Sequence, residues 1–190
     1  KYFKAVNCVD TDEIARIVPE TSIAAKSLRI KYEICNKKVI LFVGAITQEK
    51  RIDRLLYAFK RVIKKLDDSI LLIVGSGPVI SEIKALATQL ELQDSVIFTG
   101  EIIEGVGAYF QLADVFVLPG LGGLAISEAL AHGLPVICTQ GDGCEVDLVI
   151  NGETGYRFYS SSDEEVIDFI AMKLVKILQN EDFQMYMSNK

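Results

Sequence analysis

Three glycines stand close together after an apolar run, and a carboxylate follows them one turn into a predicted helix. The segment from 118 to 128 reads Leu-Pro-Gly-Leu-Gly-Gly-Leu-Ala-Ile-Ser-Glu. Glycines let the backbone pass close to a ligand, and the free N–H groups at a helix N-terminus favour an anion such as a diphosphate. Glu128 could accept hydrogen bonds from two adjacent hydroxyls of a ribose. Alternatively, it is a carboxylate that the helix dipole favours, and the residues alone leave both roles open.

A lysine lies where it could reach the same crevice. Lys50 stands in the loop after the strand predicted at 38–44, and Gly44 ends that strand, where a glycine allows close approach. A lysine in this place supplies a mobile positive charge for a phosphate. The alternative is a solvated surface lysine, since the chain has 20 Lys and Arg residues in all.

Two further motifs favour structural roles. The stretch 75–77 (Gly-Ser-Gly) follows a strand and opens a helix, as in a dinucleotide-binding fingerprint. The third glycine position is Ile80, however, and no acidic residue ends the next strand, so we expect a tight turn and not NAD binding. The stretch 10–12 (Asp-Thr-Asp) could hold a metal, but it precedes the core strands, and Asp12 could instead cap a helix over 13–17.

The histidine and the cysteines form no zinc-binding pattern. The four cysteines show no C-x-x-C spacing and do not combine with His132, the single histidine, into a ligand set. We expect His132 to be a cation at a helix C-terminus rather than a base, and Cys138 to be a small core residue. No signal-like segment opens the chain, so reduced thiols in a cytosol are expected.

Composition narrows the class of protein. Of 190 residues, 50% are hydrophobic and 24% charged. No apolar run reaches the ~18 residues that a membrane span requires, so we expect neither disorder nor a transmembrane segment. The net charge of −6 argues against a surface that binds nucleic acid. The mean hydropathy of +0.30 is high and suggests a face that another domain or a membrane covers.

The hydrophobic pattern alternates between buried strands and amphipathic helices. The run at 38–44 is continuously apolar and ends in glycine, which is typical of a strand buried on both faces of a parallel sheet. The same reading predicts further strands at 70–75, 95–99, 114–118, 135–138 and 156–159. It predicts helices at 52–66, 79–90, 106–112, 124–132, 145–150 and 163–178, the last capped within the serines at 160–162.

This alternation predicts an α/β fold with a doubly wound, Rossmann-like, mostly parallel sheet. Ligands of such sheets bind beyond the carboxyl ends of the strands, so the informative loops follow Gly44, Gly75, Thr99, Leu118 and Thr139. We expect residues 1–37 to be a linker and lead-in helix, and residues 38–190 to form the ligand-binding domain. The missing initiator Met suggests a piece of a longer chain.

A series of short motifs follows one order along nearly the whole chain. They are Asn-Cys-Val-Asp at 7–10, Val-Gly at 43–44 with Lys50 and Asp53, Ile-Val-Gly-Ser-Gly-Pro at 73–78, Val-Ile-Phe-Thr-Gly at 96–100, Ala-Asp-Val-Phe-Val-Leu-Pro at 113–119, Glu-Ala-Leu-Ala-His-Gly-Leu-Pro-Val-Ile at 128–137 and Asn-Gly-Glu-Thr-Gly at 151–155. In this order they resemble the C-terminal, donor-binding domain of retaining glycosyltransferases of the GT-B fold. This is the group 1 family of glycosyl transferases, related to glycogen and sucrose-phosphate synthases and to bacterial lipopolysaccharide and capsule transferases.

The resemblance implies a site for a nucleotide-diphosphate sugar. Lys50 would contact the diphosphate, with close approach at Gly44, and Glu128 would bind the ribose hydroxyls. The backbone would contact phosphate and sugar at Gly122, Gly123 and Leu124, and the base near Glu101 and Ile102. The resemblance assigns no catalytic residue with certainty. It implies no metal or other cofactor, because helix dipoles and basic side chains would stabilise the leaving diphosphate.

Two positions depart from the family's pattern. The family usually has Arg where this chain has Ala45, and a first Glu where this chain has Gly120. Losing one of two phosphate cations can cost about 1.5 to 3 kcal/mol, which weakens donor binding without excluding it. Some branches of the family read Pro-Gly-x-x-Gly-Leu here, so Gly120 marks either a subfamily or a loss of activity.

We hypothesise that the chain is the donor-binding part of a bacterial hexosyltransferase of polysaccharide biosynthesis. It would serve retaining transfer to a saccharide or lipid-linked acceptor, bound by an N-terminal domain absent from this chain, so the fragment alone should be inactive. We expect a cytoplasmic protein, with peripheral contact at the inner membrane face through that absent domain. One alternative is a degenerate, non-catalytic partner domain, motivated by Ala45 and Gly120. A second is a nucleotide-sugar 2-epimerase, against which the single histidine argues.

Overall fold

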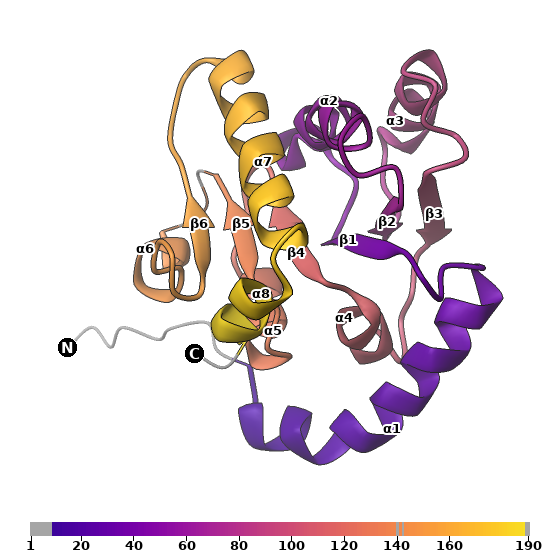
Figure 1. Ribbon diagram of the computed structural model, residues 1–190, viewed down its shortest axis with the longest axis vertical. Helices are drawn as coiled ribbons and strands as arrows, with labels where there is room; N and C mark the ends of the chain where they lie inside the picture. The colour runs from indigo at the N-terminus through magenta and orange to yellow at the C-terminus, as the bar shows by residue number, and fades with distance from the viewer. Residues whose placement is uncertain (1–8, 140, 142, 189–190) are drawn as a thin grey trace.

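A six-stranded parallel sheet with helices on both faces forms the core of the computed structural model, which describes residues 9–139, 141 and 143–188 (Figure 1). The strands lie in the order β3-β2-β1-β4-β5-β6. Their bounds are β1 Lys38–Val43, β2 Ser69–Val74, β3 Val96–Gly100, β4 Val115–Leu118, β5 Val136–Cys138 and β6 Gly155–Arg157. The predicted doubly wound, Rossmann-like α/β fold is confirmed.

The chain reverses its direction of travel across the sheet between β3 and β4. From β1 it moves outward to β2 and β3, then returns to place β4 beside β1, with Ile40 paired to Val115, and continues to β5 and β6. The carboxyl ends of β1 and β4 therefore flank a topological switch point. Open parallel sheets bind their ligands at such a point.

Helices cover both faces of the sheet. Figure 1 shows α2, α3 and α7 on one face and α1, α4 and α5 on the other, with α6 beside β6. The helices are α1 Thr11–Lys31, α2 Ile52–Val62, α3 Ile80–Gln89, α4 Gly107–Leu112, α5 Leu124–Ala131, α6 Cys144–Leu148, α7 Asp163–Leu178 and α8 Glu181–Ser188, and one 3-10 turn, η1, spans Gln48–Lys50. In the described part of the chain, no helix is both long and apolar enough to cross a bilayer.

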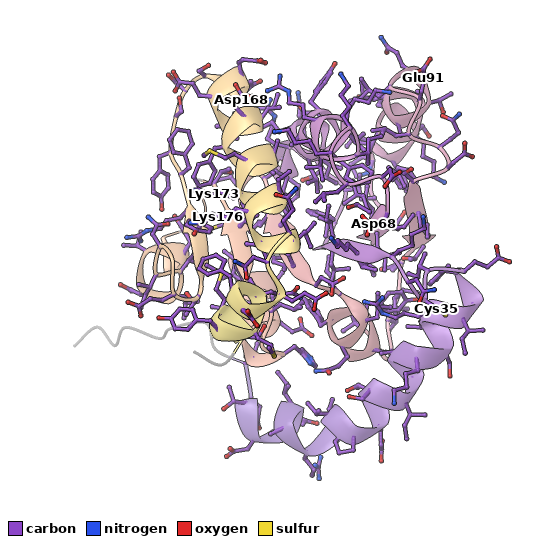
Figure 2. The ribbon with its side chains drawn as sticks, viewed as in Figure 1. Cys35, Asp68, Glu91, Asp168, Lys173 and Lys176 are labelled. Carbon is purple, nitrogen blue, oxygen red and sulfur yellow. The ribbon has the colours of Figure 1, made fainter. Side chains whose placement is uncertain are left out.

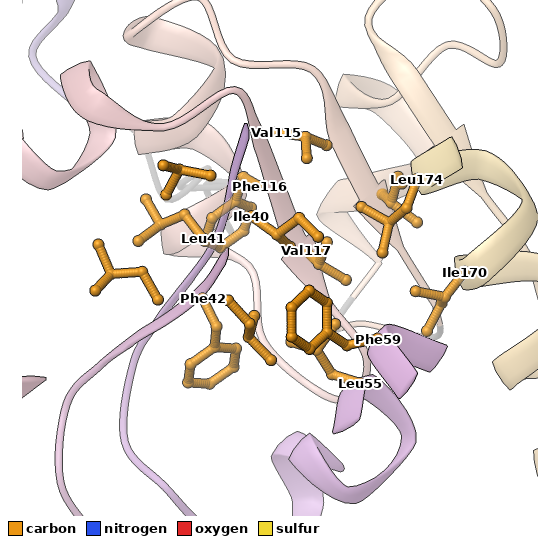
Figure 3. Close-up of a cluster of buried hydrophobic side chains, with 14 of the residues drawn as sticks. Ile40, Leu41, Phe42, Leu55, Phe59, Val115, Phe116, Val117, Ile170 and Leu174 are labelled. Atoms are coloured by element: carbon orange, nitrogen blue, oxygen red, sulfur yellow. The ribbon is translucent and has the colours of Figure 1, made fainter. Parts of the chain in front are cut away.

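The core lies between the sheet and the helices that cover it. All six residues of β2 are buried, as the continuous apolar pattern predicts for a central strand. Leu55 and Phe59 of α2 and Ile170 of α7 pack onto the middle of the sheet on the side of Val117 (Figure 3), whereas Phe116 points to the other face, toward Phe110 of α4. Each such buried side chain contributes about 1.5 to 3 kcal/mol. The core therefore holds the ends of β1 and β4, and the loops after them, in place.

The lead-in helix differs from the one the sequence predicts. It runs over 21 residues, and its cap is Asp10, whose carboxylate accepts a hydrogen bond from the N–H of Glu13 at 2.9 Å. The predicted cap at Asp12, over a short helix at 13–17, is wrong because Asp12 already lies inside the first turn. Arg29 of α1 donates to the carbonyl of Leu112 at the end of α4, so α1 is fixed to the sheet domain.

The last helix, α8, is not among the helices that the sequence pattern predicts. Asn180 caps it by accepting a hydrogen bond from the N–H of Phe183 at 2.9 Å, and two acidic residues open its first turn. An asparagine followed by two acidic residues is a typical helix start, so the sequence at 180–182 contained a signal for this helix. Gln184 of α8 donates to the backbone and side chain of Asp114, just before β4. The helix α8 therefore packs at the amino end of β4, on the side of the sheet opposite the switch point.

Lysines of α7 cover aromatic rings of its neighbours. The ammonium of Lys173 lies 4.2 Å from the ring centroid of Tyr156 in β6, and that of Lys176 lies 5.0 Å from the ring of Phe183 in α8 (Figure 2). Cations over aromatic faces contribute about 0.5 to 2 kcal/mol. These contacts fasten α7 to the last strand and to α8.

Candidate functional site

The loops after β1 and β4 meet at the switch point. Residues 44–51 follow β1 and residues 119–123 follow β4. The N–H of Leu121 donates to the carbonyl of Glu49 at 2.9 Å, which joins the two loops directly. The structure therefore brings together the Lys50 loop and the glycine-rich segment, as the sequence predicts.

Gly120 allows this close approach. A Cβ at position 120 would lie less than 3.0 Å from backbone atoms of both Glu49 and Lys50. Backbone cannot yield as a flexible side chain can, so a larger residue would push the two loops apart. The glycine that stands where the family usually has Glu thus has a structural reason here.

Lys50 lies directly against Gly122. A Cβ built on Gly122 would come within 3.0 Å of the Lys50 ammonium nitrogen, and Gly122 adopts φ +142°, which favours glycine. Lys50 is half-buried, and no carboxylate in the described part of the chain forms a salt bridge with it. A cation thus stands beside the glycine-rich loop. After the hydrogen bonds from its own backbone N–H and from Thr47, the charge of Lys50 helps to lower the pKa of the neighbouring, exposed Glu49 without a salt bridge between the two.

The arginines that follow Lys50 are held elsewhere. Arg51 binds Asp53 at 3.0 Å and Asp163, at the start of α7, at 2.5 Å, while Arg54 binds Asp163 at 2.5 Å. Hydrogen bonds from Arg51 and Arg54 lower the pKa of Asp163, and those to Asp53 and Asp163 raise the pKa of Arg51 above its usual range. These pairs anchor η1 to α7 and hold the backbone that carries Lys50.

The N-terminus of α5 lies at the same place. The helix begins at Leu124, and Gly123 precedes it as a cap with no side chain. The first N–H groups of a helix have no partner within it, and they carry the positive end of its dipole. Leu124 is 54% exposed. The predicted backbone contacts at Gly122, Gly123 and Leu124 thus fall where α5 begins, next to Lys50.

Glu128 lies one turn into α5 and is half-buried. Burial raises the pKa of its carboxyl above the ordinary value. None of the hydrogen bonds formed among the described residues engages this carboxylate. Perturbed carboxylates of this kind cluster at functional sites, which favours the ribose-binding role over that of a simple dipole partner.

Glu101 and Ile102 lie farther along the same edge, after β3. Two strands, β2 and β1, separate β3 from β4, which at about 4.8 Å per spacing places them roughly 14 Å from the β4 loop. Glu101 is exposed, and Ile102 lines a cavity of about 590 Å³ that α1 and α4 also border. The predicted site is therefore an elongated one along the carboxyl ends of four strands.

The glycines at 75 and 77 lie in the tight turn after β2 that the sequence predicts. Gly75 has φ +136°, and a Cβ there would lie less than 3.0 Å from the carbonyl of Gly44. The loops after β1 and β2 are thus packed backbone to backbone. Gly44 itself has φ +150°, and its Cβ position meets only the ring of Phe42. Gly44 therefore has the ring of Phe42 beside its Cβ position and the backbone of Gly75 beside its own backbone.

The expectation for His132 is wrong, and that for Cys138 is confirmed. His132 ends α5, but its ring stacks on Phe110 with centroids 5.3 Å apart, and its Nδ1 lies 3.0 Å from the amide of Gln111. Burial lowers its pKa below the ordinary value, which disfavours the charged form that a capping cation needs. Cys138 is 1% exposed in β5.

Glu145 lies at the edge of the site, although the predictions from the sequence place it only in a helix at 145–150. Its carboxylate is 3% exposed and accepts hydrogen bonds from the N–H of Gly141, the N–H of Gly143 and the hydroxyl of Tyr159. Burial opposes its charge, but these bonds and one from its own N–H outweigh burial and lower its pKa. Two glycines before a glutamate, just after a strand, were the available signal.

Comparison with known proteins places the chain among glycosyltransferases. Residues 26–190 match the family described as glycosyl transferases group 1. Over 143 residues the chain is 37% identical to alpha-monoglucosyldiacylglycerol synthase of Streptococcus pneumoniae. The matched region covers 73% of this chain and 32% of that protein. The chain thus spans about a third of the length of this relative.

Solved structures share the fold. WaaG, a glycosyltransferase involved in lipopolysaccharide biosynthesis, superposes with a TM-score of 0.76 at 23% identity, over 90% of this chain and 45% of that one. The pneumococcal O-GlcNAc transferase GtfA, solved with UDP and GlcNAc, gives 0.73 at 21% identity, over 82% and 32%. At these identities the likeness shows the fold.

Proposed function

Since this chain belongs to the group 1 family of glycosyl transferases, we propose that it binds the nucleotide-sugar donor of a hexosyltransferase that retains the anomeric configuration. The single observation that carries the proposal is the Lys50 ammonium against Gly122, at the N-terminus of α5. A cation, glycine backbone and helix N–H groups converge there at the switch point of a parallel sheet. That combination suits a diphosphate.

The donor would lie along the carboxyl edge of the sheet. Lys50 pairs with the diphosphate, and the N–H groups at Gly123 and Leu124 donate to phosphate oxygens. Glu128, one turn farther into α5, accepts hydrogen bonds from the two ribose hydroxyls. The base extends toward Glu101 and Ile102, where backbone atoms after β3 meet it. This path passes the backbone of Gly44 at the end of β1.

Catalysis would depend on stabilising the leaving group. As the bond between the sugar's anomeric carbon and the diphosphate breaks, negative charge grows on the diphosphate. Lys50 and the dipole of α5 are fixed in place to meet that charge before it forms, which is the most effective form of electrostatic catalysis. This arrangement operates without a metal ion or other cofactor.

The acceptor would be a saccharide or lipid-linked group. One relative is named for a diacylglycerol product and one structural neighbour for lipopolysaccharide biosynthesis, and the chain spans only part of each. The acceptor site would belong to the part of the protein outside this chain. We place the protein in the cytoplasm, with peripheral contact at the inner face of the membrane through that other part.

The second candidate is a partner domain that has lost donor binding. Ala45 favours it, because a usual phosphate cation is missing and the position is exposed. Gly120 no longer supports it, since the fit against Glu49 and Lys50 requires a glycine. The alternative therefore rests on one residue.

Calorimetric titration with UDP, GDP and ADP and their sugar conjugates tests the proposal. The full-length protein should bind one of these nucleotides, and Glu128→Ala should weaken that binding by about tenfold or more, as expected for losing charged hydrogen bonds to ribose. Glu153→Ala, an exposed glutamate in the turn before β6, is the matched control and should bind normally. If no nucleotide binds at millimolar concentration, the partner-domain alternative is supported.

A further inference from the structure

The buried Glu145 and the exposed Tyr159 form a hydrogen-bonded pair that the donor contacts above do not use. The Tyr159 hydroxyl donates to Glu145 Oε1 at 3.0 Å. The same carboxylate accepts from the N–H of Gly141 at 3.2 Å and from that of Gly143 at 2.9 Å. An ionised carboxylate bonded to several donors holds them more firmly than a neutral acceptor would.

Gly141 connects this pair to the proposed diphosphate site. A Cβ built on Gly141 would lie 2.5 Å from Glu145 Oε2 and 3.0 Å from the carbonyl oxygen of Gly122. Gly141 thus fills the space between the carboxylate and the backbone of Gly122. Since Gly122 also lies against Lys50, one line of packed contacts runs from Tyr159 to the lysine.

We infer that Glu145, supported by Tyr159, is a positioning residue for the donor diphosphate. The inference rests on the proposed function. The carboxylate accepts a hydrogen bond from the N–H of Gly141 and so holds that residue next to Gly122. The position of Gly141 in turn fixes the Gly122 backbone, and with it the position of the Lys50 ammonium. Neither Glu145 nor Tyr159 contacts the donor, and both act through Gly141 and Gly122.

Because Tyr159 is exposed, a variant at this position can distinguish a positioning role for the pair from a role in the stability of the fold. Tyr159 is 47% exposed, so removing its hydroxyl leaves no core cavity and alters mainly its bond to Glu145. Glu145→Gln keeps the shape of the side chain but loses the charge, and turns one acceptor into a donor toward N–H groups. The two variants thus weaken the same contact by different means.

Steady-state kinetics and calorimetry of the full-length enzyme test the inference, with the nucleotide that the unmodified protein binds as the probe. Glu145→Gln should raise the donor KM and weaken nucleotide binding by about tenfold, and Tyr159→Phe by about threefold, with the acceptor KM unchanged. Glu153→Gln and Tyr57→Phe are matched controls at exposed sites in a turn and on α2, and should bind the nucleotide normally.

Three results would overturn it. One is an unchanged donor KM in both variants. Another is an equal rise in donor and acceptor KM together with a lower melting temperature in Tyr159→Phe, which would show a structural role only. The third is an unmodified protein that binds none of UDP, GDP and ADP, because the proposed function then fails and takes the inference with it. In the first two cases nucleotide binding by the unmodified protein leaves the proposed function standing.

Discussion

The Lys50 ammonium nitrogen and Gly122 lie so close that a Cβ at position 122 would come within 3.0 Å of that nitrogen. The two residues come from loops after β1 and β4, which are distant in sequence and adjacent in the sheet. The Leu121 N–H bond to Glu49 holds these loops together at 2.9 Å. Lys50 is thus oriented before any ligand arrives, which lowers the entropy lost on binding.

Gly122→Ala should displace Lys50. The new methyl group would meet the ammonium, and alanine at φ +142° would strain the backbone. We expect about a tenfold loss in nucleotide affinity and a fall of about 1 kcal/mol or more in the free energy of unfolding. Calorimetry and urea unfolding measure the two effects.

Gly152→Ala is the control for strain alone. Gly152 has φ +86°, and a Cβ there meets nothing within 4 Å. It should lower stability in the same way and leave nucleotide affinity unchanged. Equal affinity losses in both variants would contradict a specific effect on Lys50.

Ala45→Arg should strengthen nucleotide binding. The position is exposed, directly after the end of β1 and on the loop that carries Lys50, so a guanidinium there can reach the diphosphate. A second charged contact should raise the affinity by about tenfold, measured by calorimetry. If nucleotides bind neither before nor after the change, the degenerate partner domain is the better account.

Glu128→Gln should change stability and binding in opposite directions. Burial raises the pKa of Glu128 in the folded protein, so the folded state disfavours its charge. Below the ordinary value of 4.5 the carboxyl is protonated in both states and costs nothing; the cost appears as the pH rises and is complete above the folded pKa. At pH 7 the variant should therefore unfold at higher denaturant concentration than the unmodified protein, yet bind nucleotide more weakly.

The same comparison near pH 3 supplies the control. Both proteins then carry an uncharged group at position 128, so their unfolding free energies should converge. Lower stability of the variant at pH 7 would show that the carboxylate is a structural partner and not a ligand-binding group.

Asp163→Asn should loosen the loop that carries Lys50. Arg51 and Arg54 hold the pKa of Asp163 below its ordinary value of 3.8, so this stabilisation is present above that value and is lost as the pH falls through the folded pKa. The carboxylate is 52% exposed, and we expect a loss of about 1 kcal/mol or less in unfolding free energy. Unfolding curves at pH 7 and pH 3 measure it, and an equal loss at both would contradict the ionic origin.

Much of the fold could be predicted because its signals are local. The apolar run of β1 and the helical spacing in α2 lie within single segments, and their alternation implies the doubly wound sheet. The α8 helix was missed although its cap, Asn180, stands in the sequence, because the apolar spacing after it is short. Asp10 rather than Asp12 caps α1, which is the usual uncertainty at helix ends.

Part of the candidate site could likewise be predicted from local signals, and part could not. Lys50, the three glycines and Glu128 were predicted because each follows a strand, and the topology then brings them together. Glu145 and Tyr159 are 14 residues apart, and their contact depends on how α6 and β6 pack at the sheet edge, which no periodicity encodes. Burial against Phe110 lowers the pKa of His132, and the sequence contains no sign of that contact.

Calorimetry of Lys50→Gln with a nucleoside diphosphate and the matching monophosphate tests the central claim most directly. If Lys50 binds the diphosphate, the unmodified protein should prefer the diphosphate, and the variant should lose most of that preference, by about tenfold or more. Lys64→Gln, at an exposed position just after the C-terminal end of α2, should keep it. An undiminished preference in Lys50→Gln would contradict the account, because the diphosphate would then be bound elsewhere.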